Sequence, residues 1–184
     1  MVTGLVLVLS LMLTASEESA PWPIASAVRS SSTSIRALLV EGVRDSGTFK
    51  RLVDTLDASD GIVYVEAGRC RRGADRLNAC LVNDVAAAGG RRYLRILVDL
   101  RKDPVDLTGS IGHEIQHAVE VLSDRSVTSM ASMLAFYQGD GRNGARSYET
   151  EAAVDAGLSV AREISASRKQ MVIAQRPRSD SAPR

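Results

Sequence analysis

The segment His113-Glu114-Ile115-Gln116-His117 constrains this chain more than any other feature, because it is an HExxH motif containing the only two histidines of the sequence. On an α-helix, residues four positions apart lie on one face, so both imidazoles can bind one Zn²⁺. Glu114 would then lie where it can act on a water at the metal. Apolar residues recur at helical spacing from Leu107 to Leu122. The motif therefore predicts a zinc site on a helix with one buried side.

A catalytic zinc site needs a third protein ligand. The sequence has no third histidine and no cysteine near the motif, so the ligand must be a carboxylate. Glu151 is the preferred candidate, because Glu151 and Asp155 are spaced to share one face of a second helix. Glu151 would bind the metal, and Asp155 would accept a hydrogen bond from the outer ring nitrogen of His113.

Two other glutamates compete for the role of third ligand. Glu149 lies two residues before Glu151, but Ala153 occupies the position four residues further on, so Glu149 lacks a supporting carboxylate there. Glu120 follows His117 by three residues on the same helix, and three ligands from consecutive turns of one straight helix close a tetrahedron poorly. We therefore expect Glu120 to support a ligand or to form a salt bridge.

The ordered set of His113, Glu114, His117, Glu151 and Asp155 resembles the gluzincin metallopeptidases, in which HExxH is followed by a glutamate ligand on a later helix, often as ExxxD. The short interval between the two motifs looks most like the small single-domain members, the minigluzincins. The resemblance covers roughly residues 60 to 165. It implies a short sheet before the active-site helix, with an edge strand lining the substrate cleft.

The larger gluzincins also carry a histidine or tyrosine that stabilises the oxyanion, and here both histidines are already used. Tyr148 is the leading substitute, because it precedes Glu151 by three residues and would point towards the metal. An equally good interpretation is that Tyr148 packs at the start of a helix. Tyr137, Arg142 and Arg146 are weaker candidates.

These residues predict a zinc-dependent metallopeptidase that hydrolyses peptide bonds, with Zn²⁺ as cofactor and Glu114 as general base and catalytic residue. The predicted partner is a peptide or protein substrate. The alternative is a catalytically silent metal-binding envelope protein that binds peptides or a protein partner. A zinc amidase acting on another substrate is a third, weaker reading.

Residues 4–15 form an apolar run that is too short for a comfortable membrane span and fits the central part of a secretory signal. We expect residues 1–20 to be a signal peptide and the protein to be exported. Anchoring to the membrane through residues 4–15 is the alternative. The predicted organisation continues with a linker over 21–33, a zincin-like domain over 34–172 and a disordered tail over 173–184.

Cys70 and Cys80 bracket a charged, turn-like segment, so a disulfide between them would close a hairpin in an oxidising compartment. In a reducing compartment both would be inert thiols. The chain has 184 residues, 45% hydrophobic content and a formal charge of +1, which suits a single soluble domain. No bias towards nucleic acid is evident, and the oligomeric state is not predicted.

The predicted fold class is α+β, with a small antiparallel sheet of about three strands packed against helices. Helices are expected over residues 35–44, 48–56 and 127–138, strands over 62–67, 77–85 and 93–100, and a turn at Gly89-Gly90. If the strand over 93–100 lies at the sheet edge, its free backbone groups could bind an extended peptide. Arg91, Arg92 and Arg95 would instead protect such an edge from aggregation.

Overall fold

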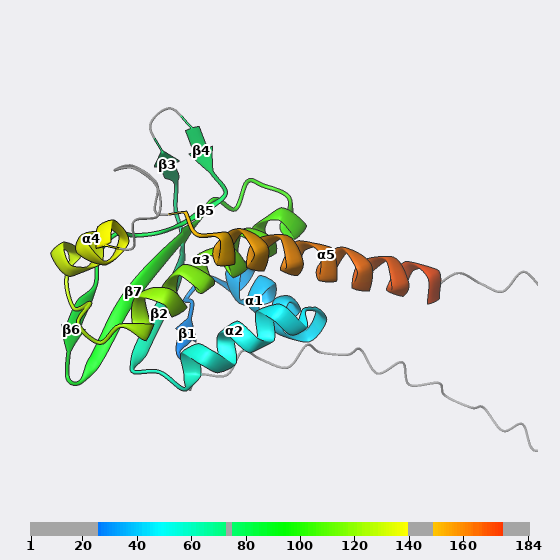
Figure 1. The fold of residues 1–184 in the computed structure, drawn as a ribbon. Helices are drawn as coiled ribbons and strands as arrows, with labels where there is room; N and C mark the ends of the chain where they lie inside the picture. The colour runs from blue at the N-terminus through cyan, green and yellow to red at the C-terminus, as the bar shows by residue number, and fades with distance from the viewer. Residues whose placement is uncertain (1–25, 73–74, 140–148, 175–184) are drawn as a thin grey trace, which may run out of the picture.

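The computed structural model describes residues 26–72, 75–139 and 149–174, and its chain is an α+β fold in which helices pack against a mixed sheet (Figure 1). The predicted signal peptide and most of the predicted tail lie outside the described residues. The elements of the described part are β1 (Val28–Arg29), α1 (Thr33–Asp45), α2 (Gly47–Asp57), β2 (Gly61–Ala67), β3 (Cys70–Arg72), β4 (Asp75–Leu77), β5 (Ala79–Leu81), β6 (Ala86–Ala88), β7 (Arg91–Val98), α3 (Pro104–Ser123), α4 (Met130–Gly139) and α5 (Glu151–Ala174).

The sheet differs from the predicted three antiparallel strands. Its order is β1-β2-β7-β5, with β6 also paired to β7, and β3 and β4 form a separate hairpin. β1, β2 and β7 run parallel, whereas β5 and β6 run antiparallel to β7. The prediction of an antiparallel sheet was wrong because strand direction depends on which strands pair. β1 was missed because two residues carry no readable alternation, and it falls inside the predicted linker.

β7 is an interior strand, so the idea that it forms the free edge was wrong. β2 pairs along one side of β7, and β5 and β6 pair along the other. The alternation predicted for this strand is confirmed, since Leu94, Ile96 and Val98 are buried. The predicted turn is also confirmed, because Gly89 and Gly90 both have positive φ, at 58° and 74°, and join β6 to β7.

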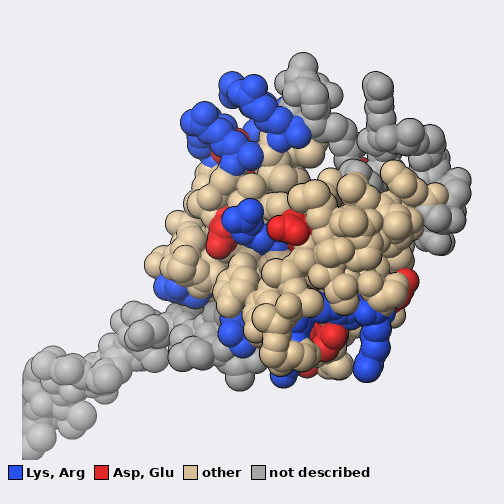
Figure 2. All heavy atoms as spheres, turned by 90° about the vertical axis from the view of Figure 1, so that its left-hand side faces the viewer, with Lys and Arg blue, Asp and Glu red and all other residues tan. Residues whose placement is uncertain are grey.

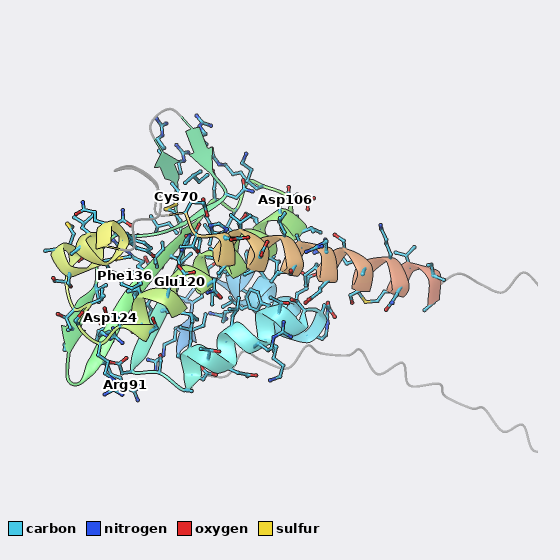
Figure 3. The ribbon with its side chains drawn as sticks, in the orientation of Figure 1. Cys70, Arg91, Asp106, Glu120, Asp124 and Phe136 are labelled. Carbon is cyan, nitrogen blue, oxygen red and sulfur yellow. A yellow bond between two sulfur atoms is a disulfide. The ribbon has the colours of Figure 1, made fainter. Side chains whose placement is uncertain are left out.

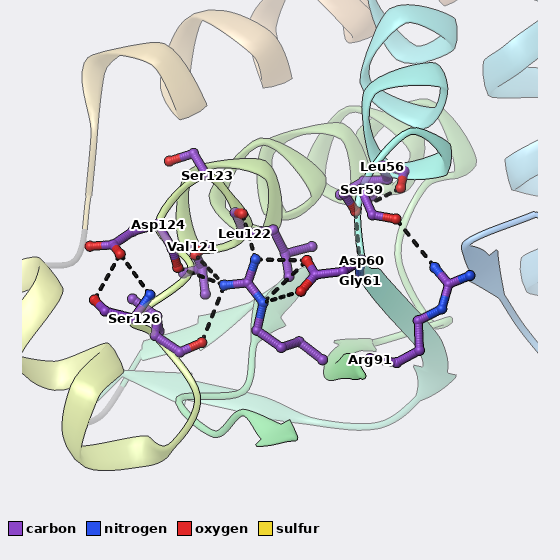
Figure 4. Close-up of polar contacts among 12 residues, drawn as sticks. Leu56, Ser59, Asp60, Gly61, Arg91, Val121, Leu122, Ser123, Asp124 and Ser126 are labelled. Carbon is purple, nitrogen blue, oxygen red and sulfur yellow. Dashed lines mark hydrogen bonds and ion pairs between the residues drawn. The ribbon is translucent and has the colours of Figure 1, made fainter. Parts of the chain in front are cut away.

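Arg92 does not protect an edge either; its side chain is only 4% exposed. The guanidinium pairs with Asp60 at 2.8 Å and donates to backbone carbonyls at the C-terminal end of α3 and just beyond it (Figure 4). The carbonyl acceptors belong to Val121, Leu122, Asp124 and Val127. Because the last carbonyls of a helix have no partner within the helix, Arg92 fixes where α3 ends.

The helices enclose a continuous core against the sheet, as predicted for the two helices that precede β2. α1 and α2 contact β2, and α3 contacts β7. Phe49 of α2, Ile96 of β7 and Ile111 and Ile115 of α3 are among its fully buried side chains. No helix in the described ranges is long and apolar enough to cross a membrane.

The predicted disulfide between Cys70 and Cys80 is present. It does not join partners across the β3–β4 hairpin, because Cys70 pairs with Leu77 there. Instead it ties the first residue of β3 to the middle of β5. The bond therefore holds the hairpin against the outer strand of the sheet.

Candidate metal centre

α3 carries the HExxH residues, and the residues at its N-terminus determine where it begins. The Asp103 side chain caps the helix by accepting a hydrogen bond from the Val105 backbone N–H at 2.8 Å, and Pro104 occupies its first turn. The imidazoles of His113 and His117 lie on one face with ring centroids 4.8 Å apart. The side chains of His113 and His117 are 20% and 8% exposed.

α5 packs closely along α3 because glycines line the contact. A Cβ added at Gly109 would lie 3.1 Å from the Gly157 carbonyl oxygen, and one added at Gly157 would lie 3.0 Å from Cβ of His113. Larger residues at these positions would push the two helices apart. The close approach brings the beginning of α5 next to the two histidines.

Glu149, two residues before the first residue of α5, supplies the carboxylate that lies near the histidines. Its Oε1 atom lies 2.9 Å from Nε2 of His113 and 3.7 Å from Nε2 of His117. One ligand atom from each of these three residues lies within 4.8 Å of the other two. Ligand atoms around a tetrahedral zinc ion are about 3.3 Å apart, given metal–ligand bonds of about 2.0–2.1 Å. The distances of 2.9 and 3.7 Å lie on either side of this value, so the two imidazole nitrogens and the carboxylate oxygen could hold a metal ion.

Glu151, the preferred ligand in the sequence, is solvent-exposed in the first turn of α5. Asp155 is also exposed, and the structure brings neither residue into the histidine cluster. The expectation assumed that the helix continues through both glutamates, whereas the helix begins only at Glu151. The missed signal was Thr150, whose hydroxyl accepts a hydrogen bond from the Ala153 N–H at 3.1 Å and caps α5.

Glu120 lies on α3 (Figure 3) and contacts His117, as expected from the sequence for a residue that supports a ligand. Its Oε2 lies 3.1 Å from Nδ1 of His117, and its Oε1 accepts hydrogen bonds from the Thr150 hydroxyl at 2.7 Å and the Gln116 amide at 3.2 Å. Burial disfavours a charged His117, but the hydrogen bond to Glu120 and the charge of Glu114 raise the pKa of His117 above its usual value. With Nδ1 engaged, Nε2 is the nitrogen that faces Glu149.

Glu114 lies beside this donor set but is not part of it. Its Oε2 accepts a hydrogen bond of 2.7 Å from the Leu81 backbone N–H of β5. Burial raises the pKa of Glu114, while His117, His113 and the Leu81 N–H act in the opposite direction. A carboxylate with a raised pKa beside residues that could hold a metal ion can act as a general base or acid.

A cleft of about 560 Å³ opens beside His113, Glu114 and Glu149. β5 borders it on one side, and the exposed apolar residues Val154 and Leu158 of α5 border it on the other. The cleft thus combines the donor set with an accessible apolar wall.

The strand side of the cleft is formed by β5, whose residue Ala79 lines the cleft and is 4% exposed. The Val82 N–H donates to the Arg95 carbonyl, and the Asp99 N–H donates to the Asn78 carbonyl. Hydrogen-bonded and non-hydrogen-bonded residue pairs alternate along two antiparallel strands. Ala79 belongs to a non-hydrogen-bonded pair, so its backbone N–H and C=O point away from β7. β5 is therefore the outer strand of the sheet beside the histidines and Glu149.

Arginines mark the upper end of the cleft. Arg76 of β4 lines it, and Arg76 is paired across the hairpin with Arg71. Both side chains are exposed, and Lys and Arg gather at the top of the face seen in Figure 2. The cleft rim is therefore positive at the hairpin.

Four residues were considered for oxyanion stabilisation. Tyr148, Arg142 and Arg146 lie outside the described residues. Tyr137 of α4 lies with its ring edge-on to His117, at a centroid distance of 6.1 Å. Tyr137 is therefore the one of these four candidates that the described part of the chain brings near the histidines.

No protein-family model, no curated protein and no solved structure matches this chain. The resemblance to gluzincins therefore rests on the sequence motif, and the structure does not bring Glu151 and Asp155 of that motif to the histidines.

Proposed function

We propose that this protein is a zinc-dependent metallopeptidase of the gluzincin kind, with His113, His117 and Glu149 as the metal ligands. The observation that carries the proposal is the convergence of this donor set with Glu114 at one cleft bordered by the outer strand β5. Structural zinc sites are mostly closed by cysteine, and both cysteines of this chain are joined to each other and are not among the donors. Three protein ligands leave one position for catalysis.

Zn²⁺ bound by these residues would supply Lewis acidity, which activates water and polarises a carbonyl group. Glu114 takes the proton from the attacking water and delivers it to the leaving amine. The Leu81 N–H holds one carboxylate oxygen of Glu114, at 2.7 Å, and so fixes the direction of the other. His117 is oriented by Glu120, which keeps its Nε2 available to the metal.

We propose that the substrate is an extended peptide that lies along β5 where this strand borders the cleft. This proposal transfers the expected strand addition from β7 to β5, because β7 is paired on both sides. β5 and the donor set border the same cleft, so a peptide on this edge would pass beside the metal. Main-chain hydrogen bonds give affinity with little sequence preference.

Export remains part of the proposal. The disulfide between Cys70 and Cys80 favours an oxidising compartment, since such bonds seldom persist in the cytosol. The apolar residues 4–15 would direct the chain there.

The first test is metal content. Wild type, His117→Ala, Glu149→Ala and Glu151→Ala are exposed to equal zinc, dialysed and measured by mass spectrometry. We expect one zinc per chain in wild type and Glu151→Ala, and loss in the other two variants. Glu151→Ala is a matched control, because it removes a glutamate only two residues from the proposed ligand. Retention in Glu149→Ala with loss in Glu151→Ala would overturn the ligand assignment.

The second test is hydrolysis of a quenched-fluorescent peptide library by wild type and Glu114→Gln. We expect turnover by wild type, and a loss of about 10²- to 10⁴-fold in Glu114→Gln with zinc retained. A wild type that holds zinc and binds peptides but cleaves none would favour the silent binding protein instead.

A further inference from the structure

Glu120 occupies the place where α3 meets the segment leading into α5. Its side chain is 17% exposed, and its two carboxylate oxygens contact two different residues. Oε2 faces Nδ1 of His117, whereas Oε1 accepts a hydrogen bond from the Thr150 hydroxyl. One carboxylate therefore touches a ligand from α3 and the residue that follows the ligand Glu149.

The contact with His117 fixes the imidazole. When the neutral imidazole donates from Nδ1 to Glu120, 3.1 Å away, its lone pair is on Nε2, the atom 3.7 Å from the Glu149 carboxylate. A carboxylate in this position sets both the tautomer and the ring orientation of a metal ligand.

The contact with Thr150 fixes the neighbouring backbone. The Thr150 hydroxyl donates to Glu120 at 2.7 Å and accepts from the Ala153 N–H at 3.1 Å. Thr150 is 8% exposed, so both hydrogen bonds are largely protected from water. Because Glu149 directly precedes Thr150, restraint of the Thr150 hydroxyl also restrains the backbone that carries the third ligand.

We infer that Glu120 is a positioning residue that sets the geometry of His117 and, through Thr150, of Glu149. The inference rests on the proposed metal site. Neither Glu120 nor Thr150 would bind the ion. Both would affect metal affinity through the positions of His117 and Glu149. Loss of such a support typically lowers metal affinity by about 10- to 100-fold.

Glu163 provides a matched control, because it makes similar contacts at a different place on α5. Its carboxylate accepts hydrogen bonds from the Ser46 hydroxyl at 2.6 Å, the Thr48 N–H at 3.0 Å and the Thr48 hydroxyl at 2.8 Å. Glu163 thus fastens α5 to the start of α2. Its removal should weaken the fold without altering the donor set.

The experiment compares wild type with Glu120→Ala, Glu120→Gln, Thr150→Val, Thr150→Ser and Glu163→Gln. Zinc affinity is measured by chelator competition, ligand geometry by the visible absorption of bound Co²⁺, and stability by urea unfolding in EDTA. The last measurement separates a variant that folds poorly from one that binds metal poorly.

We expect Glu120→Ala to weaken zinc binding by about 10- to 100-fold and to change the Co²⁺ spectrum. Glu120→Gln, which keeps one acceptor oxygen, should recover part of the affinity. Thr150→Val should weaken binding, whereas Thr150→Ser, which keeps the hydroxyl, should resemble wild type. Glu163→Gln should lose stability in EDTA and keep both the zinc affinity and the Co²⁺ spectrum.

Wild-type zinc binding together with unchanged affinity and spectra in Glu120→Ala and Thr150→Val overturns this inference and leaves the proposed function intact. Equal losses of affinity in Glu163→Gln and Glu120→Ala also overturn it, because the effect would then follow general stability. Absence of zinc binding by wild type overturns the proposed function and this inference together.

Discussion

The C-terminal end of α3 and its middle both gather charged groups, but they balance charge in different ways. At the end, the buried Arg92 meets the Asp60 carboxylate and carbonyls of α3, so its guanidinium is satisfied by the protein itself. In the middle, Glu114, Glu149 and Glu120 surround His113 and His117. A divalent cation would neutralise this excess of carboxylates. The first cluster therefore closes the fold, and the second could hold a metal ion.

The largest expected effect comes from breaking the closed cluster. Arg92→Ala leaves Asp60 and several carbonyls without their buried donor and should lower the free energy of unfolding by about 3–5 kcal/mol. Urea unfolding measures the loss. The adjacent Arg91→Ala is the control, because Arg91 is exposed and makes one bond to the Ser59 carbonyl, so its effect should stay within about 0.5 kcal/mol. Similar losses of unfolding free energy in the two variants would show that the buried contacts of Arg92 stabilise the fold no more than the surface contact of Arg91.

A smaller effect is expected from opening the disulfide beside the metal-binding cluster. Replacing Cys70 and Cys80 together by serine should cost about 2–4 kcal/mol, because the closed segment gains freedom in the unfolded chain. Thermal unfolding of the double variant and of reduced wild type measures this loss. β5 supplies the N–H that holds Glu114, so any peptidase activity should fall more than stability at 25 °C accounts for. Full activity in the double variant would contradict a role of the disulfide in holding β5.

Zinc itself should stabilise only the chains whose donor set is intact. At a zinc concentration one hundred times Kd, the expected gain in unfolding free energy is about 2.7 kcal/mol. The gain should be the same in Arg92→Ala as in wild type and absent in His117→Ala. Calorimetric unfolding with and without zinc tests this. A gain lost in Arg92→Ala would show that the two clusters are coupled through α3.

The smallest effect concerns pH at the closed cluster. The hydrogen bond from Arg92 holds the pKa of Asp60 below its usual value. A depressed pKa adds stability above the unfolded value of about 4, and this stability is lost as pH falls through the folded value. The stability difference between wild type and Asp60→Asn should therefore shrink as pH falls below about 4. Urea titrations of metal-free protein from pH 3 to 7 give this difference, and one that grew towards low pH would contradict the sign.

Much of the local structure could be read from the sequence. The pattern from Leu107 to Leu122 predicts α3, the Gly89-Gly90 turn follows from φ preferences, and β7 shows period-two alternation. The Cys70–Cys80 bond was predicted from spacing and a turn-like segment. Each of these signals depends on near neighbours along the chain.

The errors share one physical cause. The third carboxylate was assigned to Glu151 by assuming that one helix passes through residues 147–155, but Thr150 caps the helix and leaves Glu149 outside it. The strand over 93–100 was considered as a possible edge strand, whereas β7 is paired on both sides, because strand order arises from pairings between distant segments. Arg92 was read as a surface charge, because nothing near it in the sequence shows that the end of α3 packs over it.

The sequence by itself determined that His113, Glu114 and His117 share one helix and that Cys70 and Cys80 are close enough to join, because both follow from short-range geometry. Only the tertiary structure decided that Glu149 completes the donor set, that Glu120 holds both His117 and Thr150, and that β5 borders the cleft. Those contacts depend on how closely α5 approaches α3 and on which strands pair, and both are set by packing between segments that are far apart in the chain.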